Sequence, residues 1–179
     1  MYEVELKLRV DHERVRERLA AIGAEPAGAV HQEDTYYDAP TRSFAETDEA
    51  LRIRRETDDR GAEARVTYKG PLVESASKTR EEFETGVADG ETMDSILRKL
   101  GFEPAAIVEK DRERFELDGY AVTLDDVAGL GEFLEVETEA ETIDPAREGA
   151  RELLRELELD PNEQIRRSYL ELLLGDAQQ

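Results

Sequence analysis

The 179-residue chain contains no cysteine and no tryptophan, and only five of its residues are lysines. Without cysteine it can form neither a disulfide nor a thiolate metal site, and it has no cysteine nucleophile. No apolar run reaches the roughly 18 residues of a membrane-spanning helix. The N-terminus is charged and alternating, unlike a secretory signal peptide. These absences predict a cytoplasmic protein.

Positive charge is also scarce, since 24 Lys and Arg residues face 45 Asp and Glu residues and the formal net charge is −21. Such a charge repels phosphate backbones and anionic lipids, so we expect neither nucleic acid nor a membrane as a partner. Many carboxylates with few lysines are typical of a halophilic protein, because high salt screens the self-repulsion. An acidic mesophilic protein is the alternative. The 39% hydrophobic content argues against disorder.

Alternation of apolar and charged residues predicts most of the secondary structure. Residues 2–10 alternate without a break, which predicts a strand with Val4, Leu6 and Leu8 on one face and Glu3, Glu5, Lys7 and Arg9 on the other. Asp118-Gly119 predicts a two-residue hairpin turn. The remaining predicted strands cover residues 32–38, 48–56, 63–69, 78–88, 107–117, 120–126 and 132–140.

Helical spacing of apolar residues predicts four helices. One follows Asp11 and ends at Gly23, a second covers residues 92–100, a third begins at Asp144-Pro145 and the last covers residues 163–174. No linker or repeat divides the chain, so residues 1–179 are expected to form a single domain. Eight strands joined mostly by short turns predict an α+β fold: an eight-stranded antiparallel β-barrel with helices packed outside.

The charges on the strand faces are sorted by sign. A solvated sheet surface is the ordinary explanation of one such face, but ten of the 24 basic residues lie on these faces in an otherwise acidic protein. The acidic positions are Glu3, Glu5, Asp125, Glu135 and Glu137, and the basic ones are Lys7, Arg9, Arg52, Arg54, Arg65, Lys69, Arg80, Lys110, Arg112 and Arg114.

Both sets would share one lumen if these faces turn inward, because an eight-stranded barrel is wide enough for side chains or one small ligand. Carboxylates supply the hard oxygen ligands that Mg²⁺ or Mn²⁺ prefers. Arginine and lysine neutralise phosphate oxygens. The combination therefore predicts a polyphosphate held together with a divalent cation.

The order of short motifs resembles the CYTH, or triphosphate tunnel metalloenzyme, superfamily. The chain begins with Glu3-x-Glu5-x-Lys7, similar to the ExExK signature of that superfamily, and the C-terminal Ser168-Tyr-Leu-Glu-Leu-Leu is similar to its class IV adenylyl cyclase branch. Between them lie Asp34-Thr-Tyr-Tyr-Asp38, Leu51-Arg52-Ile-Arg54, Thr67-Tyr-Lys69-Gly-Pro71, Lys78-Thr-Arg80-Glu-Glu82, Glu109-Lys110-x-Arg112 and Leu124-Asp125-x-Val-x-Gly-Leu-Gly131-x-Phe-Leu-Glu135-Val-Glu137.

The resemblance implies an eight-stranded triphosphate tunnel and a role for each matched position. Glu3, Glu5 and Glu135 correspond to metal ligands, supported by Asp125 and Glu137. The implied triphosphate-binding residues are Lys7, Arg52, Arg54, Lys69, Arg80, Lys110 and Arg112. Glu3, Glu5 and Lys7 are the implied catalytic residues. Glu82 either orients the basic residues or serves as an internal salt-bridge partner.

Three functions follow from these residues. The leading hypothesis is a class IV adenylyl cyclase that uses Mg²⁺ or Mn²⁺ to convert ATP to cyclic AMP and pyrophosphate. The first alternative is hydrolysis of inorganic, nucleoside or thiamine triphosphate, and the second is a polyphosphate-binding module without catalysis. The resemblance and the apolar C-terminal segment leave a homodimer open. His12 and His31 are expected to be surface residues outside the tunnel.

Overall fold

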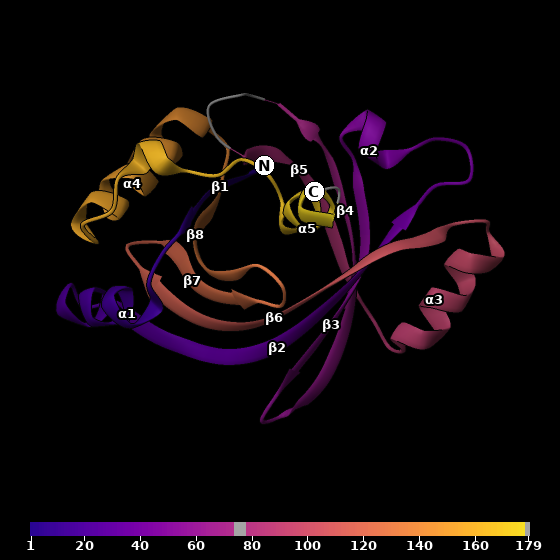
Figure 1. Cartoon of the computed structure of the whole chain (residues 1–179), viewed down its shortest axis with the longest axis horizontal. Helices are drawn as coiled ribbons and strands as arrows, with labels where there is room; N and C mark the ends of the chain where they lie inside the picture. Colours follow the sequence, from indigo (N-terminus) through magenta and orange to yellow (C-terminus); the bar gives the residue numbers. More distant parts are fainter. Residues whose placement is uncertain (74–77, 178–179) are drawn as a thin grey trace.

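The alternating segments pair into a closed antiparallel barrel with the strand order β1-β5-β4-β3-β2-β6-β7-β8, shown in Figure 1. This computed structural model describes residues 1–73 and 78–177. The strands within them are β1 (Tyr2–Arg9), β2 (Glu25–Asp38), β3 (Ala50–Asp58), β4 (Gly61–Leu72), β5 (Lys78–Val87), β6 (Glu103–Leu117), β7 (Tyr120–Val127) and β8 (Gly131–Ala140). The predicted fold class is confirmed.

The register of the strand pairs closes the barrel and places inward-facing residues of neighbouring strands side by side. β1 pairs with β8 along its whole length, from Tyr2↔Ala140 to Arg9↔Phe133. Its seam with β5 is shorter and includes Glu3↔Arg80. At the predicted hairpin between β6 and β7, Asp118 and Gly119 both adopt positive φ, of 52° and 82°. Two consecutive positive φ angles match the right-handed twist of the flanking strands.

The main hydrophobic core lies outside the barrel, under two helices. Helices α1 (His12–Ala21) and α4 (Ile143–Glu156) cover the outer face of β1, β7 and β8 (Figure 1). Leu6 and Leu8 of β1 pack there against Leu19 of α1 and Leu154 of α4, and each is at most 1% exposed. Burying one such side chain contributes about 1.5–3 kcal/mol. Because these residues turn outward, the alternating charged residues of β1 must turn inward.

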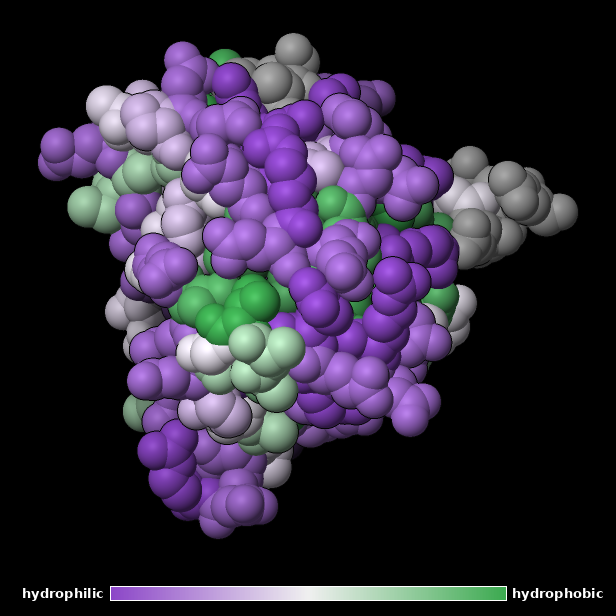
Figure 2. All heavy atoms as spheres, turned by 90° about the vertical axis from the view of Figure 1, so that its left-hand side faces the viewer, coloured by the Kyte–Doolittle hydropathy of each residue, from purple (hydrophilic) through white to green (hydrophobic). Residues whose placement is uncertain are grey.

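The other helices are no longer than α1. Helix α2 (Phe44–Thr47) is a single turn, α3 (Gly90–Lys99) packs Leu97 against Tyr37 and Ile53, and α5 (Tyr169–Ala177) follows the 3₁₀ turn η1 (Pro161–Glu163). No helix in residues 1–73 and 78–177 is long and apolar enough to cross a membrane. On the face seen in Figure 2 most side chains are hydrophilic, with a small hydrophobic patch near its centre.

Several element boundaries differ from the prediction. β2 begins at Glu25 rather than at residue 32, because this segment pairs with β6 through its backbone although its side chains do not alternate. The last helix begins at Tyr169 rather than at residue 163. Ile165 before it is held by backbone pairing instead, with its N–H donating to the carbonyl oxygen of Lys7 at 2.7 Å. Helix α2 was not predicted.

One of the two histidines also differs from its prediction. His31 is exposed, as expected, but His12 is only 6% exposed. Its Nε2 lies 2.9 Å from the carbonyl oxygen of Phe133, and its backbone N–H donates to Glu132 at 3.0 Å. The surface prediction for His12 rested on its position outside the strand registers that face the tunnel. That position packs on the beginning of β8 and is buried.

Candidate active site

The interior of the barrel holds a cavity of about 1170 Å³ lined mainly by charged side chains. Every strand except β7 contributes such residues, because the inward positions alternate with the outward core positions. The predicted site residues that line it are Glu3, Glu5, Lys7, Arg52, Arg54, Lys69, Arg80, Lys110, Arg112, Glu135 and Glu137. Asp125, the remaining one, is fully buried and contacts these residues.

Three carboxylates meet on the β1–β8 side of the cavity. The pairs Glu5↔Glu137 and Lys7↔Glu135 place Glu5, Glu135 and Glu137 together, with one oxygen of each within 4.8 Å of the others. Burial, reinforced by the neighbouring carboxylates Glu3 and Glu135, raises the pKa of Glu137 to about 7. A divalent cation would relieve this repulsion, and carboxylate oxygens suit Mg²⁺ or Mn²⁺. The three residues therefore fit a metal site.

Glu3 lies apart from this group and shares a lysine with Glu82. Lys69 Nζ is 2.8 Å from Glu3 Oε1 and 2.9 Å from Glu82 Oε2. Burial raises the pKa of Glu3, but the charge of Lys69, hydrogen bonds with Glu82 and Lys69 and the charge of Arg52 together lower that pKa to about 2. Burial and the hydrogen bond with Glu3 raise the pKa of Glu82 to about 7. Glu82 therefore serves as a salt-bridge partner that also orients Lys69.

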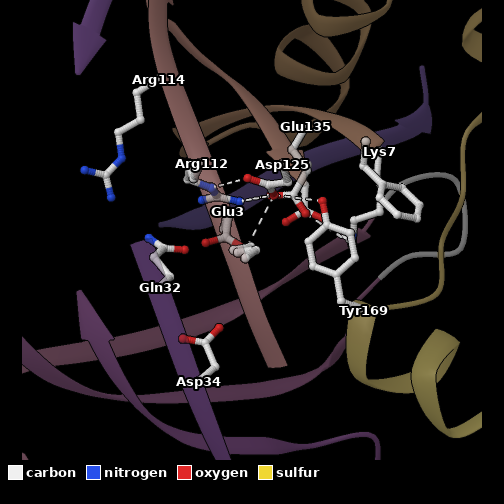
Figure 3. Close-up of polar contacts among 12 residues, drawn as sticks. Glu3, Lys7, Gln32, Asp34, Arg112, Arg114, Asp125, Glu135 and Tyr169 are labelled. Atoms are coloured by element: carbon white, nitrogen blue, oxygen red, sulfur yellow. Dashed lines mark hydrogen bonds and ion pairs between the residues drawn. The ribbon is translucent and has the colours of Figure 1, made fainter. Parts of the chain in front are cut away.

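Arg112 joins two strands through a buried pair of carboxylates. Its Nε and Nη2 donate to Asp125 Oδ1 and Oδ2, both at 2.6 Å, and Nη2 also donates to Glu135 at 2.7 Å (Figure 3). Lys7 Nζ lies 3.2 Å from the other oxygen of Glu135. This chain of contacts fixes Arg112, Glu135 and Lys7 relative to one another.

Asp34 of β2 anchors the two arginines of the β3 motif. Arg54 donates to it twice, with Nε and Nη2 each 2.7 Å from a carboxylate oxygen, and Arg52 Nη1 lies 3.6 Å away. Burial opposes ionisation, but the positive charge of Arg52 lowers the pKa of Asp34 below its usual range. Asp34 is 2% exposed. It therefore acts as a buried counter-ion that holds both guanidinium groups along the cavity wall.

The last two basic residues are held differently. Arg80 Nη1 donates to the carbonyl oxygen of Gly70 at 3.0 Å. Lys110 Nζ lies 3.3 Å from Asp125, and burial together with the charge of Arg112 lowers the pKa of Lys110 to about 8. Two arginines, Arg112 and Arg54, and two carboxylates, Asp125 and Glu135, act on this lysine, and burial decides the direction of the shift.

Two contributors to the site were not predicted. Asp34 belongs to the motif Asp34-Thr-Tyr-Tyr-Asp38, but it was given no role in the site from the sequence, although it lies on the same inward-facing side of the strand as Gln32 and Tyr36. Tyr169 was quoted in the C-terminal motif and fell within the predicted last helix, but it was given no role in the site; its hydroxyl donates to Asp125 at 2.8 Å. The register of the strand predicted over residues 32–38 could have indicated the first, whereas the C-terminal motif that contains Tyr169 gives no sign of its contact with Asp125.

Comparisons with known proteins agree with this geometry. The CYTH domain family model matches residues 1–169. "Putative adenylate cyclase MJ0240" of Methanocaldococcus jannaschii is 42% identical over 96% of this chain and 98% of its own. "Adenylate cyclase CyaB" of Aeromonas hydrophila is 29% identical over 94% and 86%. The solved structure of the PH1819 protein from Pyrococcus horikoshii has a TM-score of 0.88 at 40% identity and covers 97% of this chain and 99% of that one.

Proposed function

The chain belongs to the CYTH domain family, and from this premise we propose that it is a metal-dependent enzyme that converts ATP to cyclic AMP and pyrophosphate. One observation carries the proposal. Seven basic side chains and a group of three carboxylates surround a single cavity inside the barrel. The two relatives named above carry adenylate cyclase names, which favours cyclisation over hydrolysis as the reaction.

The basic residues supply what a triphosphate needs. Arg52 and Arg54 come from β3, Lys69 from β4 and Lys110 and Arg112 from β6, so the phosphate oxygens would be contacted from several sides. Each of these cations is already held by a carboxylate. This preorganisation lowers the entropy that binding would otherwise cost. The tunnel therefore binds the triphosphate and fixes its direction.

The reaction then requires positioning rather than a protein nucleophile. The ribose 3′-hydroxyl releases its proton to solvent, and its oxygen forms a bond to the α-phosphorus. The bond between the α-phosphorus and the oxygen that bridges it to the β-phosphorus breaks, and pyrophosphate leaves with that oxygen. Glu5, Glu135 and Glu137 would hold Mg²⁺ or Mn²⁺, which supplies charge stabilisation to the phosphate oxygens. Arg112 and Lys7, fixed against Glu135, hold the departing pyrophosphate.

Product identification tests the proposal. Purified protein is incubated with ATP and Mn²⁺ in high salt, and cyclic AMP, pyrophosphate and orthophosphate are quantified. We expect cyclic AMP and pyrophosphate in equal amounts. Orthophosphate without cyclic AMP would show a triphosphatase instead. Binding of ATP without any product under Mg²⁺ or Mn²⁺ would show a binding module.

The Arg52→Ala variant is expected to raise the KM for ATP about 10- to 100-fold, because a charge-assisted hydrogen bond contributes about 1.5–3 kcal/mol. Asp34 keeps its two bonds from Arg54, so the fold should persist. Initial rates over a range of ATP concentrations measure the change. Arg60→Ala is the control, because this side chain is 91% exposed and pairs with Asp58 in a turn. If Arg52→Ala and Arg60→Ala have the same KM for ATP, Arg52 does not contact the substrate.

A further inference from the structure

Tyr169 is one of the residues of the C-terminal segment that line the charged cavity inside the barrel. It opens α5 and is 6% exposed, and Figure 3 shows its side chain directed from that helix toward Asp125 and Glu135. The residue is not one of the charged positions that define the cavity. Its contacts nevertheless connect α5 to three of the proposed substrate-binding side chains.

The ring of Tyr169 faces two ammonium groups. Lys7 Nζ lies 3.9 Å from the ring centroid, and Lys110 Nζ lies 4.8 Å from it. Both distances fall within the range in which an aromatic face attracts a cation. Lys7 and Lys110 come from β1 and β6, which are not neighbours in the barrel. One ring therefore fixes two cations that no shared strand pairing holds together.

The hydroxyl of Tyr169 makes a separate contact. It donates to Asp125 Oδ2 at 2.8 Å, the same oxygen that accepts from Arg112 Nη2 at 2.6 Å. Arg112 in turn contacts Glu135. The hydroxyl thus orients the carboxylate that orients Arg112, and its effect on a substrate would pass through that arginine.

Ordinary packing explains only part of this arrangement. The edge of the ring meets Phe133 with centroids 5.1 Å apart, and Leu172 one turn later packs in the same cluster with Val108 and Val127. Leu172 alone could seat the helix on the barrel. A leucine or a phenylalanine at position 169 would serve packing equally well. Of these two, only phenylalanine would also present an aromatic ring to the two ammonium groups.

We infer that Tyr169 is a positioning residue of the triphosphate site: its ring holds Lys7 and Lys110 toward the substrate, and its hydroxyl holds Arg112 through Asp125. This assignment rests on the proposed function. It makes α5 part of the binding machinery, and it separates two effects within one side chain. The ring acts on substrate affinity, whereas the hydroxyl acts on the orientation of Arg112 during turnover.

Three variants of the full-length protein separate these effects from packing. Tyr169→Phe removes the hydroxyl, Tyr169→Leu removes the hydroxyl and the ring, and Leu172→Ala loosens α5 without touching a charged residue. Calorimetric titration with inorganic tripolyphosphate measures affinity, ATP turnover gives kcat and KM, and thermal unfolding reports stability.

We expect Tyr169→Leu to weaken tripolyphosphate binding about tenfold, and Tyr169→Phe to restore it to within about threefold of the parent. Tyr169→Phe should lower kcat about fivefold at an unchanged KM, since one charge-assisted bond to Asp125 is lost. Leu172→Ala should lower the melting temperature and leave the Kd for tripolyphosphate unchanged.

Other outcomes overturn the inference. Parent-like affinity in Tyr169→Leu, or equally weak binding in Tyr169→Phe and Tyr169→Leu, removes the role of the ring. Weakened binding in Leu172→Ala equal to that in Tyr169→Leu reduces Tyr169 to packing. A parent protein that neither binds tripolyphosphate nor turns over ATP would contradict the proposed function itself. A parent protein that binds tripolyphosphate, with Tyr169 variants that bind it equally well, would contradict only the role of Tyr169.

Discussion

The Glu135→Gln variant is expected to lower kcat about 10²- to 10³-fold, the largest loss of activity that we expect from a single substitution. Glu135 is the one carboxylate that belongs to the group with Glu5 and Glu137 and also contacts both Arg112 and Lys7. The substitution removes one negative charge from the proposed metal site and weakens two cationic contacts. A metal acting on phosphate oxygens stabilises the transition state by several kcal/mol, and each 1.36 kcal/mol changes the rate tenfold.

Glutamine keeps the size of the side chain, and its amide oxygen can still accept from Arg112, so the fold should be retained. Binding of tripolyphosphate without added metal should change little, since the basic residues remain. Steady-state rates at saturating ATP and increasing Mn²⁺ measure the effect. Glu139→Gln is the matched control, because Glu139 lies on the same strand, is exposed and stands outside the three-carboxylate group. A kcat for Glu135→Gln within threefold of the parent would remove Glu135 from the proposed metal site.

The barrel was predictable because apolar and charged residues alternate along most of its strands, the first part of β2 being an exception. In β1 the outward residues Leu6 and Leu8 pack under α1 and α4, so Glu5 and Lys7 must face the interior. Strand alternation fixes this relation locally, without any knowledge of the distant contacts. The same rule placed Arg52, Lys69 and the other predicted triphosphate-binding residues around one lumen, whereas Arg9 is exposed and does not line it.

The contacts between these residues were less predictable. Asp125, Glu3 and Glu135 all lie on inward-facing strand positions. In the closed barrel, however, Asp125 pairs with Arg112, Glu3 pairs with Lys69, and Glu135 joins Glu5 and Glu137. Which cation each carboxylate meets depends on the stagger of the closed barrel. That stagger follows from all eight strand pairings together, and no single segment encodes it.

Tyr169 shows a different limit. It reads as an apolar position of a C-terminal helix, and in part it is one, since it packs on Phe133. Its contact with Asp125 spans 44 residues of sequence and depends on where α5 begins. The non-helical segment before it, with Ile165 bonded to Lys7, sets that position. Tertiary pairing there overrides the helical pattern that predicted a start at residue 163.

Asp125→Ala is expected to produce the largest loss of stability, about 3–5 kcal/mol in the free energy of unfolding. Asp125 is 0% exposed, and it is the counter-ion shared by Arg112 and Lys110, which are 6% and 4% exposed. Removing the carboxylate leaves Lys110 with a buried charge that lacks its nearest carboxylate, and it leaves Arg112 with the hydrogen bond to Glu135. Two buried charges left with so little compensation cost more than the lost hydrogen bonds would suggest.

The pH dependence of this loss has a definite sign. Burial opposes ionisation of Asp125, but Arg112 and Lys110 hold its pKa below the value of about 3.9 expected in the unfolded chain. The unfolded state therefore binds the proton first as the pH falls, and the stabilisation by Asp125 is complete above about pH 5 and is lost below it.

Denaturant titrations of parent and Asp125→Ala between pH 7 and pH 3 should show the difference in the free energy of unfolding shrinking toward pH 3. Asp126→Ala is the neighbouring control, because Asp126 is exposed and its removal should change stability by less than about 0.5 kcal/mol at every pH. Equal losses in the two variants, or a difference that grows as the pH falls, would show that Asp125 is not the ionised counter-ion at the centre of this site.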